Sequence, residues 1–468
     1  MNFTHRSTAL LFAALLASGP SAQGTTDGRP RGIYSMGPAP THDFVDGGVV
    51  ALPWSTGETA PGVYDFSSVD SSIAHHEALG KRMTLINFVW DVPADLLADP
   101  AVVKWTHPQA GTQPVPWDPI ALARWRAYAQ ALSSHRLPSS ALGGALVELR
   151  KHPTLAQVGC PVLGLQGLRI INGSASSMTG YTRTLFTSAM LDSVHAMRDR
   201  FAGKHGYLAV FPMNDGSNSP PLTDHLRAAL LAEFDGVRHP LLGFFQENWS
   251  AHRDQPGAPV VGWPDPSSGQ GLNDLAAKPS TFVMFQATQG WNCPFRNPAN
   301  VANAEVQDGI AWANSIYDCT YFEVYRCDLD DQTNWVALRA LATQLRAAPH
   351  EINRGAATLF VNDRTGFAPL AQGGVANLEV LGRPGSLAAV VLGAVREPTG
   401  LGTTFGLLDL DPALGFVTAI AGVLPPTGSL THAVPIPSIS LSGLGFQAAV
   451  ADAGGGVTLT ARTTITVR

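Results

Sequence analysis

The sequence predicts an α/β fold, a (β/α)8 TIM barrel followed by a small all-β sandwich domain, on two observations. Between residues 30 and 350, eight short apolar runs alternate with helix-forming segments, which is the order of strands and crossover helices in a parallel barrel. From 355 to 468, short apolar runs alternate with Gly and Pro turns, a pattern typical of a β-sandwich. This last region also lacks Trp, Tyr, Cys, Met and Lys. So sharp a change in composition places the domain boundary at 349–354.

The individual elements follow from the length and periodicity of the apolar runs. The eight barrel strands are predicted at 32–35, 49–53, 83–89, 168–171, 207–211, 241–246, 281–286 and 321–325. The helices between them are predicted at 70–79, 119–132, 183–201, 222–234, 304–314 and 334–347. The clearest strands of the sandwich are predicted at 387–392, 405–410 and 417–420.

Residues 1–23 have the three parts of a secretory signal peptide. Arg6 gives a positively charged start, residues 9–17 are apolar, and small residues at 19–22 provide a cleavage zone. No later stretch approaches the ~18 consecutive apolar residues that a membrane span needs. We therefore expect a secreted or periplasmic protein with no membrane span.

Charge and motif content narrow the partners and cofactors. Charged residues make up 14% of the chain and the net charge is −6, a balance that does not indicate binding to nucleic acid. No Cys-x-x-Cys motif or nearby His pair offers the spacing of a metal site. No Gly-rich loop before a helix matches a phosphate-binding motif. We expect neither a metal nor a cofactor.

The four cysteines would lie in an oxidising compartment, where disulfides persist. Cys319 and Cys327 flank one predicted strand, and ~26 Å of extended chain is too long for the ~4.4–6.8 Å that a disulfide allows. Cys293 and Cys327 each follow a predicted strand, so a Cys293–Cys327 bond is expected. Cys160 and Cys319 each precede one and could form a second bond at the opposite end. Four buried free thiols are the alternative.

The segment 47–97 carries the most specific motif, a strand, a polar turn, a helix and a second strand. The residues that form the motif are Trp54, Glu58, Pro61, Gly62, Tyr64, Asp65, Phe66 and Asp70. The segment resembles the second βα unit of (β/α)8 glycoside hydrolases of the β-galactosidase type, although Thr59-Ala60 separate a Glu and a Pro that are usually adjacent there. The segments 384–387 and 443–447 resemble a β-sandwich module appended to secreted bacterial proteins.

The resemblance implies two catalytic glutamates, one after strand four and one after strand seven. The predicted strand four is followed by Asn172, and Ser177 stands before Met178 where related sequences often carry Glu. The predicted strand seven ends at Gln286, whose amide can neither attack nor titrate. Both usual catalytic positions are vacant in this interpretation.

Two other glutamates stand at or near strand ends. Glu247 follows strand six, and Glu323 lies within strand eight. Because glycoside hydrolysis needs two carboxyl groups, we predict Glu247 and Glu323 as the catalytic pair. As alternatives, Glu247 binds a sugar hydroxyl or an Arg, and Glu323 is a buried ion-pair partner of Arg326 or Arg169.

Further aromatic and polar residues are predicted at the same level of the barrel, where flat rings can stack on sugars. The predicted substrate-binding residues are Trp54, Trp90, Asp91, Asn172, Asp215, Asn248, Trp249, Gln286, Trp291 and Tyr325. Core packing is the alternative for the tryptophans, and loop capping is the alternative for the aspartates.

The sequence therefore indicates a glycoside hydrolase-like protein that acts on an oligo- or polysaccharide at the C-terminal face of the barrel. Two alternatives remain: a catalytically inactive relative that binds glycans or serves as an envelope component, and a purely structural secreted protein.

Overall fold

The computed structural model describes most of the chain from residue 29 onward. Residues outside its described part are 1–28, 171–172, 212, 218, 237, 253–254, 262–274, 276–280, 288–305, 348–356, 366, 396–400, 404–405, 453–455 and 461. The predicted signal peptide, 1–23, lies outside the described residues. No helix in the described ranges is both long and apolar enough to cross a membrane.

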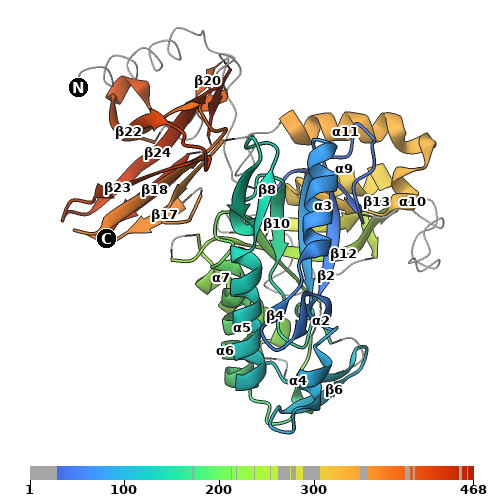
Figure 1. Cartoon of the computed structure of the whole chain (residues 1–468). Coiled ribbons are helices and arrows are strands. Elements are labelled where there is room, and N and C mark those ends of the chain that lie inside the picture. The colour runs from blue at the N-terminus through green and yellow to red at the C-terminus, as the bar shows by residue number, and fades with distance from the viewer. Residues whose placement is uncertain are drawn as a thin grey trace.

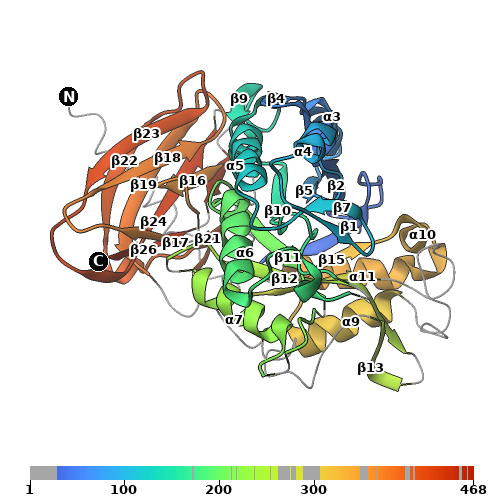
Figure 2. The same cartoon turned by 90° about the horizontal axis from the view of Figure 1, so that it is seen from below.

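The first region is a closed barrel of eight parallel strands (Figures 1 and 2). These strands are β1 (Gly32–Met36), β2 (Gly47–Pro53), β5 (Arg82–Phe88), β10 (Leu155–Gly159), β11 (His205–Ala209), β12 (Leu242–His252), β14 (Val283–Ala287) and β15 (Tyr321–Val324). β1 pairs with both β2 and β15, and β11 pairs with β12, so the ladder returns to its start. The far end of β12 forms an antiparallel pair with β13 (Gln255–Val261).

Helices surround the barrel, and each lies near its predicted position. The longer ones are α3 (Ser67–Ala78), α5 (Pro119–Ser134), α6 (Arg183–Arg198), α7 (Leu222–Glu233), α9 (Val306–Tyr317) and α11 (Trp335–Ala347). The start of α5 has a local cause, because the Asp118 carboxylate accepts the Ala121 N–H at 2.8 Å and Pro119 occupies the first turn. Thr182 caps α6 in the same way through the Leu185 N–H.

The predicted fourth strand was wrong. The barrel uses β10, which pairs with β5 and β11, and 168–171 forms no strand apart from a single bridge between Leu168 and Val210. Gln157 places a polar side chain in the middle of β10. Inside the barrel its Nε2 donates to the Thr84 hydroxyl of the neighbouring strand at 3.3 Å, whereas its Oε1 is buried without a hydrogen-bond partner.

Strand four therefore follows a long connection that contains two small hairpins as well as α5. Its other elements are α4 (Ala94–Ala98), β6 (Lys104–His107), β7 (Gly111–Pro114), β8 (Arg136–Ser139) and β9 (Ala145–Glu148). Three short elements follow β2, namely α2 (Trp54–Gly57), β3 (Glu58–Ala60) and β4 (Val63–Tyr64). The helix α10 (Arg326–Leu329) follows β15.

The C-terminal region consists of two sheets and a small hairpin. The first sheet contains β16 (Thr358–Val361), β18 (Val375–Leu381) and β23 (Ser429–Pro435). The second contains β17 (Phe367–Leu370), β26 (Thr463–Val467), β24 (Leu441–Ala451), β19 (Leu387–Ala394), β22 (Phe416–Val423) and β25 (Val457–Leu459). The hairpin pairs β20 (Leu401–Thr403) with β21 (Gly406–Leu408). Leu359 and Leu378 of the first sheet share an apolar core with Val390 and Phe446 of the second, as the predicted small all-β domain requires.

A small apolar cluster joins the C-terminal region to the barrel. Phe360 on β16 is 1% exposed and clusters with Leu142 and Val147. Leu142 lies in the turn between β8 and β9, and Val147 lies on β9. Gly203 allows this approach, since a Cβ added there would stand 2.6 Å from the Phe360 ring. An ion pair between Lys151 and Glu379 lies nearby. The contact between the two regions is therefore apolar at its centre and charged beside it.

Replacing Phe360 with Ala should lower the free energy of unfolding by about 3–5 kcal/mol, because the buried ring leaves a cavity between the two regions. Leu414→Ala is the control, since that side chain is 73% exposed and its loss should cost about 0.5 kcal/mol or less. Denaturant unfolding of the full chain measures both. Equal effects in the two variants would show that the ring does not stabilise the chain.

The expected bond between Cys160 and Cys319 is absent, because both are buried free thiols. The error follows from the misplaced strand four. Cys160 comes directly after β10, not before a strand, whereas Cys319 precedes β15. The two therefore lie at opposite ends of the parallel barrel. Cys327 lies in α10 and Cys293 lies outside the described residues, so their bond stays a prediction.

Peptide mapping without reduction should find the Cys293 peptide joined to the Cys327 peptide. Cys327→Ser should then cost ~2–4 kcal/mol of stability, as expected for loss of a native disulfide. A reduced sample is the control. Recovery of both residues as free thiols from protein exported by its native host would contradict the pairing.

Candidate active site

A cavity of about 440 Å³ opens at the C-terminal ends of the barrel strands. Its size falls within the ~300–1,000 Å³ typical of small-molecule sites. The lining residues are Met36, Ala51, Ile86, Asn87, Phe88, Gly159, Cys160, Pro161, Gln166, Gly167, Arg169, Tyr207, Leu208, Ala209, Phe245, Glu247, Gln286, Glu323 and Tyr325. All eight barrel strands contribute to this lining. The cavity is thus the mouth of the barrel, where parallel barrels carry their functional groups.

Glu323 on β15 lies fully buried in the wall of this cavity. Its Oε1 accepts hydrogen bonds from the Tyr321 hydroxyl at 3.1 Å and the Tyr207 hydroxyl at 3.5 Å. Its Oε2 is buried without a hydrogen-bond partner. Burial raises the pKa of Glu323 to about 8; the tyrosine hydrogen bonds oppose the rise, and the charge of Glu247 adds to it. Glu323 is therefore protonated at neutral pH.

Glu247 on β12 reaches the same cavity in a different environment. Its Oε2 lies 2.5 Å from a guanidinium nitrogen of Arg169. Burial raises the pKa of Glu247, and the charge and hydrogen bonds of Arg169 act in the opposite direction. One glutamate of the cavity is thus held by tyrosine hydroxyls and the other by a cation.

Arg169 is itself held by aromatic rings and a backbone contact. Its guanidinium lies 4.0 Å from the centroid of the Phe211 ring and 5.5 Å from that of Trp90, distances at which a cation is attracted to a ring face. The Arg169 carbonyl accepts from the His107 ring at 3.0 Å. These contacts fix the position from which Arg169 meets Glu247.

Gln286 lies on β14, between the strands of the two glutamates, and pairs in register with Glu323. Its Oε1 accepts the Tyr325 hydroxyl at 2.9 Å, and its Nε2 donates to the Met36 sulfur at 3.5 Å. The strand-seven position where the resemblance implies a glutamate therefore lies in the cavity and carries an amide.

The end of strand four also lacks a carboxylate, although the predicted strand was the wrong one. β10 ends at Gly159, and Cys160-Pro161 line the cavity after it. Among the described residues that line the cavity, Glu247 and Glu323 alone carry carboxyl groups. The structure therefore brings together the two glutamates that the sequence predicts as a pair.

Several predicted substrate-binding residues lie elsewhere. Trp54 is 1% exposed, donates to Glu58 at 2.8 Å and packs edge-on against Trp125, so it belongs to the core. Asp215 pairs with Arg183 at 2.7 Å, whose hydrogen bonds lower the pKa of Asp215 to about 2. Neither residue lines the cavity, because each is committed to a structural partner.

The remaining predicted positions divide between the cavity and the undescribed part. Gln286 and Tyr325 line the cavity. Trp90 is not among the lining residues, but its ring centroid lies 5.5 Å from the guanidinium of Arg169, which is. Asp91 is exposed outside the lining. The side chains of Asn248 and Trp249 on β12, and all of Asn172 and Trp291, lie outside the described residues.

Arg169, Tyr207 and Tyr321 are the site residues that the sequence analysis did not assign to the site. Tyr321 and Glu323 are two apart on one strand, so period-two alternation places them on the same face and was an available signal. Arg169 was offered as a partner of Glu323, whereas it pairs with Glu247. No local pattern indicates this, because Arg169 lies in a loop whose position depends on the whole barrel.

No protein-family model and no curated protein matches this sequence. Among solved structures, the chain is similar to a cold-adapted β-galactosidase from Rahnella sp. R3, with a TM-score of 0.40 and 8% identity over 75% of this chain and 60% of that one. It is also similar to a GH36 α-galactosidase variant from Geobacillus stearothermophilus in complex with raffinose, with a TM-score of 0.32 and 8% identity over 87% of this chain and 55% of that one. The aligned region covers less than two thirds of either protein, and at this distance neither function transfers to the chain.

The pKa of Glu323 predicts how stability depends on pH. The folded state keeps the proton up to pH about 8, whereas the unfolded chain releases it near the ordinary value of 4.5. Between these values the folded state binds the extra proton, so the stability contributed by this group falls as pH rises. Glu323→Gln cannot ionise and should lack this fall, becoming more stable than the unmutated protein toward pH 8.

Denaturant unfolding across this pH window measures the difference. Glu148→Gln is the matched control, since Glu148 lies outside the cavity and its side chain is 31% exposed. Parallel stability curves for Glu323→Gln and the unmutated protein would show that Glu323 titrates normally.

Proposed function

We propose that this protein hydrolyses a glycosidic bond of an oligo- or polysaccharide in the barrel cavity, with Glu323 as the proton donor and Glu247 as the second carboxylate. The observation that supports this is the pair itself. Two glutamates face one cavity of about 440 Å³. Glu323 is fully buried with its pKa raised to about 8, whereas Glu247 pairs with the guanidinium of Arg169. A protonated carboxyl and a second carboxyl in a different environment are the groups that glycosidases use.

Each step of the proposed reaction has a group in place. Glu323 gives its proton to the glycosidic oxygen as the bond to the sugar breaks, and the Tyr207 and Tyr321 hydroxyls then stabilise the carboxylate that forms. Glu247 supports the positive charge that develops on the sugar ring, either by attacking it or by activating a water. Arg169 favours the anionic form of Glu247 and so opposes the rise in pKa that burial causes.

The rest of the cavity has the character of a sugar site. Phe88 and Phe245 offer apolar surface, and amide groups accompany them. The Asn87 Nδ2 donates to the Gly159 carbonyl at 3.2 Å, whereas the Asn87 Oδ1 is buried without a hydrogen-bond partner. An amide oxygen without a partner in the cavity wall can accept a hydrogen bond from a sugar hydroxyl.

Two observations favour a second candidate, a non-hydrolytic protein that binds glycans. Gln286 occupies the strand-seven position where the resemblance implies a glutamate, and Arg169 already engages Glu247. A cavity in which Arg169 stays on Glu247 would bind a sugar without cleaving it. For either candidate we propose a secreted or periplasmic location, with the C-terminal domain as the β-sandwich module of secreted bacterial proteins that it resembles.

Glu323→Gln and Glu247→Gln should each lower kcat by at least ~10²-fold, the low end for general acid–base work. Both substitutions keep the shape of the side chain, so glycan affinity should survive. In the unmutated enzyme kcat should fall as pH rises through about 8, where Glu323 loses its proton. Hydrolysis of a broad glycan panel and calorimetric binding are the two measurements, with Glu148→Gln as the control.

The outcomes separate the candidates. Unchanged activity in both Gln variants would exclude this pair as catalytic. Glycan binding without hydrolysis in the unmutated protein, lost on substitution of Asn87 or Phe245, would support the binding protein instead. Neither binding nor hydrolysis on the panel would contradict both candidates.

A further inference from the structure

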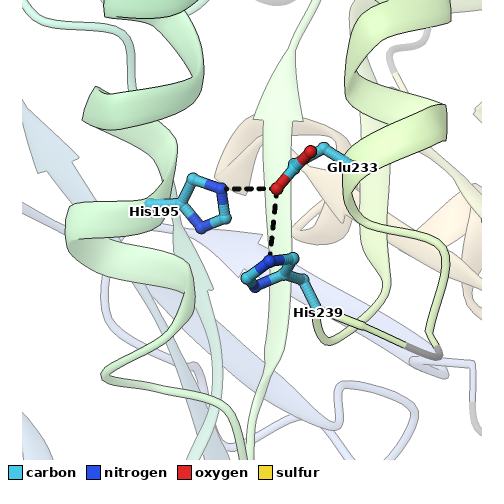
Figure 3. A group of neighbouring side chains, drawn as sticks. All are labelled: His195, Glu233 and His239. Carbon is cyan, nitrogen blue, oxygen red and sulfur yellow. Dashed lines mark hydrogen bonds and ion pairs between the residues drawn. The ribbon is translucent and has the colours of Figure 1, made fainter.

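A second cluster of ionisable side chains lies away from the cavity. His195 comes from the last turn of α6, Glu233 ends α7, and His239 lies in the loop before β12 (Figure 3). Helix α6 leads into the start of β11 and α7 into the start of β12. The cluster is therefore near the N-terminal ends of these strands, at the opposite end of the barrel from Glu247 and Glu323.

The two histidines converge on one oxygen. The Nε2 of His195 and the Nε2 of His239 each lie 3.2 Å from Oε1 of Glu233, as the two dashed lines of Figure 3 show. The three ligand atoms lie within 4.8 Å of one another. A tetrahedral zinc ion with bonds of ~2.0–2.2 Å separates neighbouring ligands by ~3.3 Å. The two nitrogen–oxygen distances are already close to those around such an ion.

Asp199 holds both rings from the other side. One of its oxygens lies 2.9 Å from Nδ1 of His195, and the other lies 3.3 Å from Nδ1 of His239. A carboxylate that accepts Nδ1–H leaves Nε2 with its lone pair, which is how histidine ligands are oriented in metal sites. Here one aspartate orients two histidines toward the same point.

We propose that His195 Nε2, His239 Nε2 and Glu233 Oε1 bind a divalent transition-metal ion, with zinc as the best fit. Two imidazoles and one carboxylate are ligands that zinc accepts in proteins. The three ligand side chains are 22–29% exposed, so a water can complete a tetrahedral shell. Asp199 is a positioning residue that accepts both Nδ1–H groups. The ion would tie α6 to the end of α7 and to the loop before β12.

No metal was expected from the sequence, because it contains no motif of closely spaced ligands. The three residues span positions 195 to 239, and the cluster forms only because successive barrel helices end side by side. Phe234 packs against both rings, with centroid distances of 4.7 Å to His195 and 5.9 Å to His239, and supports them from a third direction.

The test is zinc binding by the full, untagged chain after treatment with a chelator. Equilibrium dialysis against Zn²⁺ alone, with metal analysis, should find one ion per chain. His195→Ala and His239→Ala should each lose this ion, and Glu233→Gln, which keeps the side-chain shape, should weaken binding at least ~10-fold. Asp199→Asn should weaken it by ~10–100-fold, as expected for an orienting partner of a metal ligand. His432→Ala is the control, since His432 is exposed on the C-terminal domain.

Melting of each metal-free variant shows whether the chain still folds. Zinc should raise the melting temperature of the unmutated protein and the control, should raise it less in Glu233→Gln and Asp199→Asn, and should not raise it in His195→Ala or His239→Ala. The proposal is overturned if the unmutated chain binds no zinc, or if folded Glu233→Gln and Asp199→Asn bind it as tightly as the control. Because the readout is metal binding and not hydrolysis, its outcome is independent of the function proposed for the cavity.

Discussion

The parallel pairing of β11 with β12 closes the eight-stranded ladder, and the proposed chemistry depends on that closure. A closed barrel has one interior, and side chains of alternate residues from every strand must share it. Tyr207 of β11, Glu247 of β12 and Glu323 of β15 meet there although they are far apart in the sequence. An open sheet with the same strand order would leave Tyr207 on the edge strand β11, far from Glu323 on β15.

Burial inside the barrel determines which partners Glu247 and Glu323 need. An ionised carboxylate without a partner is costly away from water. A buried glutamate must therefore either keep its proton or pair with a cation. Glu323 keeps its proton beside two tyrosine hydroxyls, whereas Glu247 takes a guanidinium partner. Because both residues are glutamates, the difference in their electrostatic environments arises from the neighbouring side chains. The two glutamates are also linked, because the charge of Glu247 helps to keep Glu323 neutral.

The two ends of the barrel carry different kinds of site. The C-terminal end holds a cavity to which every strand contributes, and the other end holds the cluster of His195, Glu233 and His239 where helices α6 and α7 finish. The first arrangement suits a ligand that enters and leaves. The second joins neighbouring elements of the scaffold, so an ion there would act on stability near β11 and β12.

The sequence by itself determined the periodic elements. Seven barrel strands, the helices and the change to β-structure after residue 355 could be predicted, because apolar alternation reports which segments are buried. Glu247 and Glu323 could be chosen since each stands at or near the end of a strand. Tertiary structure decided the rest. Gln157 on β10 lies in register with Thr84 of the neighbouring strand β5 and donates to its hydroxyl. The local sequence does not reveal this contact between strands, so strand four was misplaced, and with it the pairing of Cys160. Arg169 and the metal-binding geometry of His195 and His239 likewise depend on contacts between segments that are remote in the chain, which a local pattern does not encode.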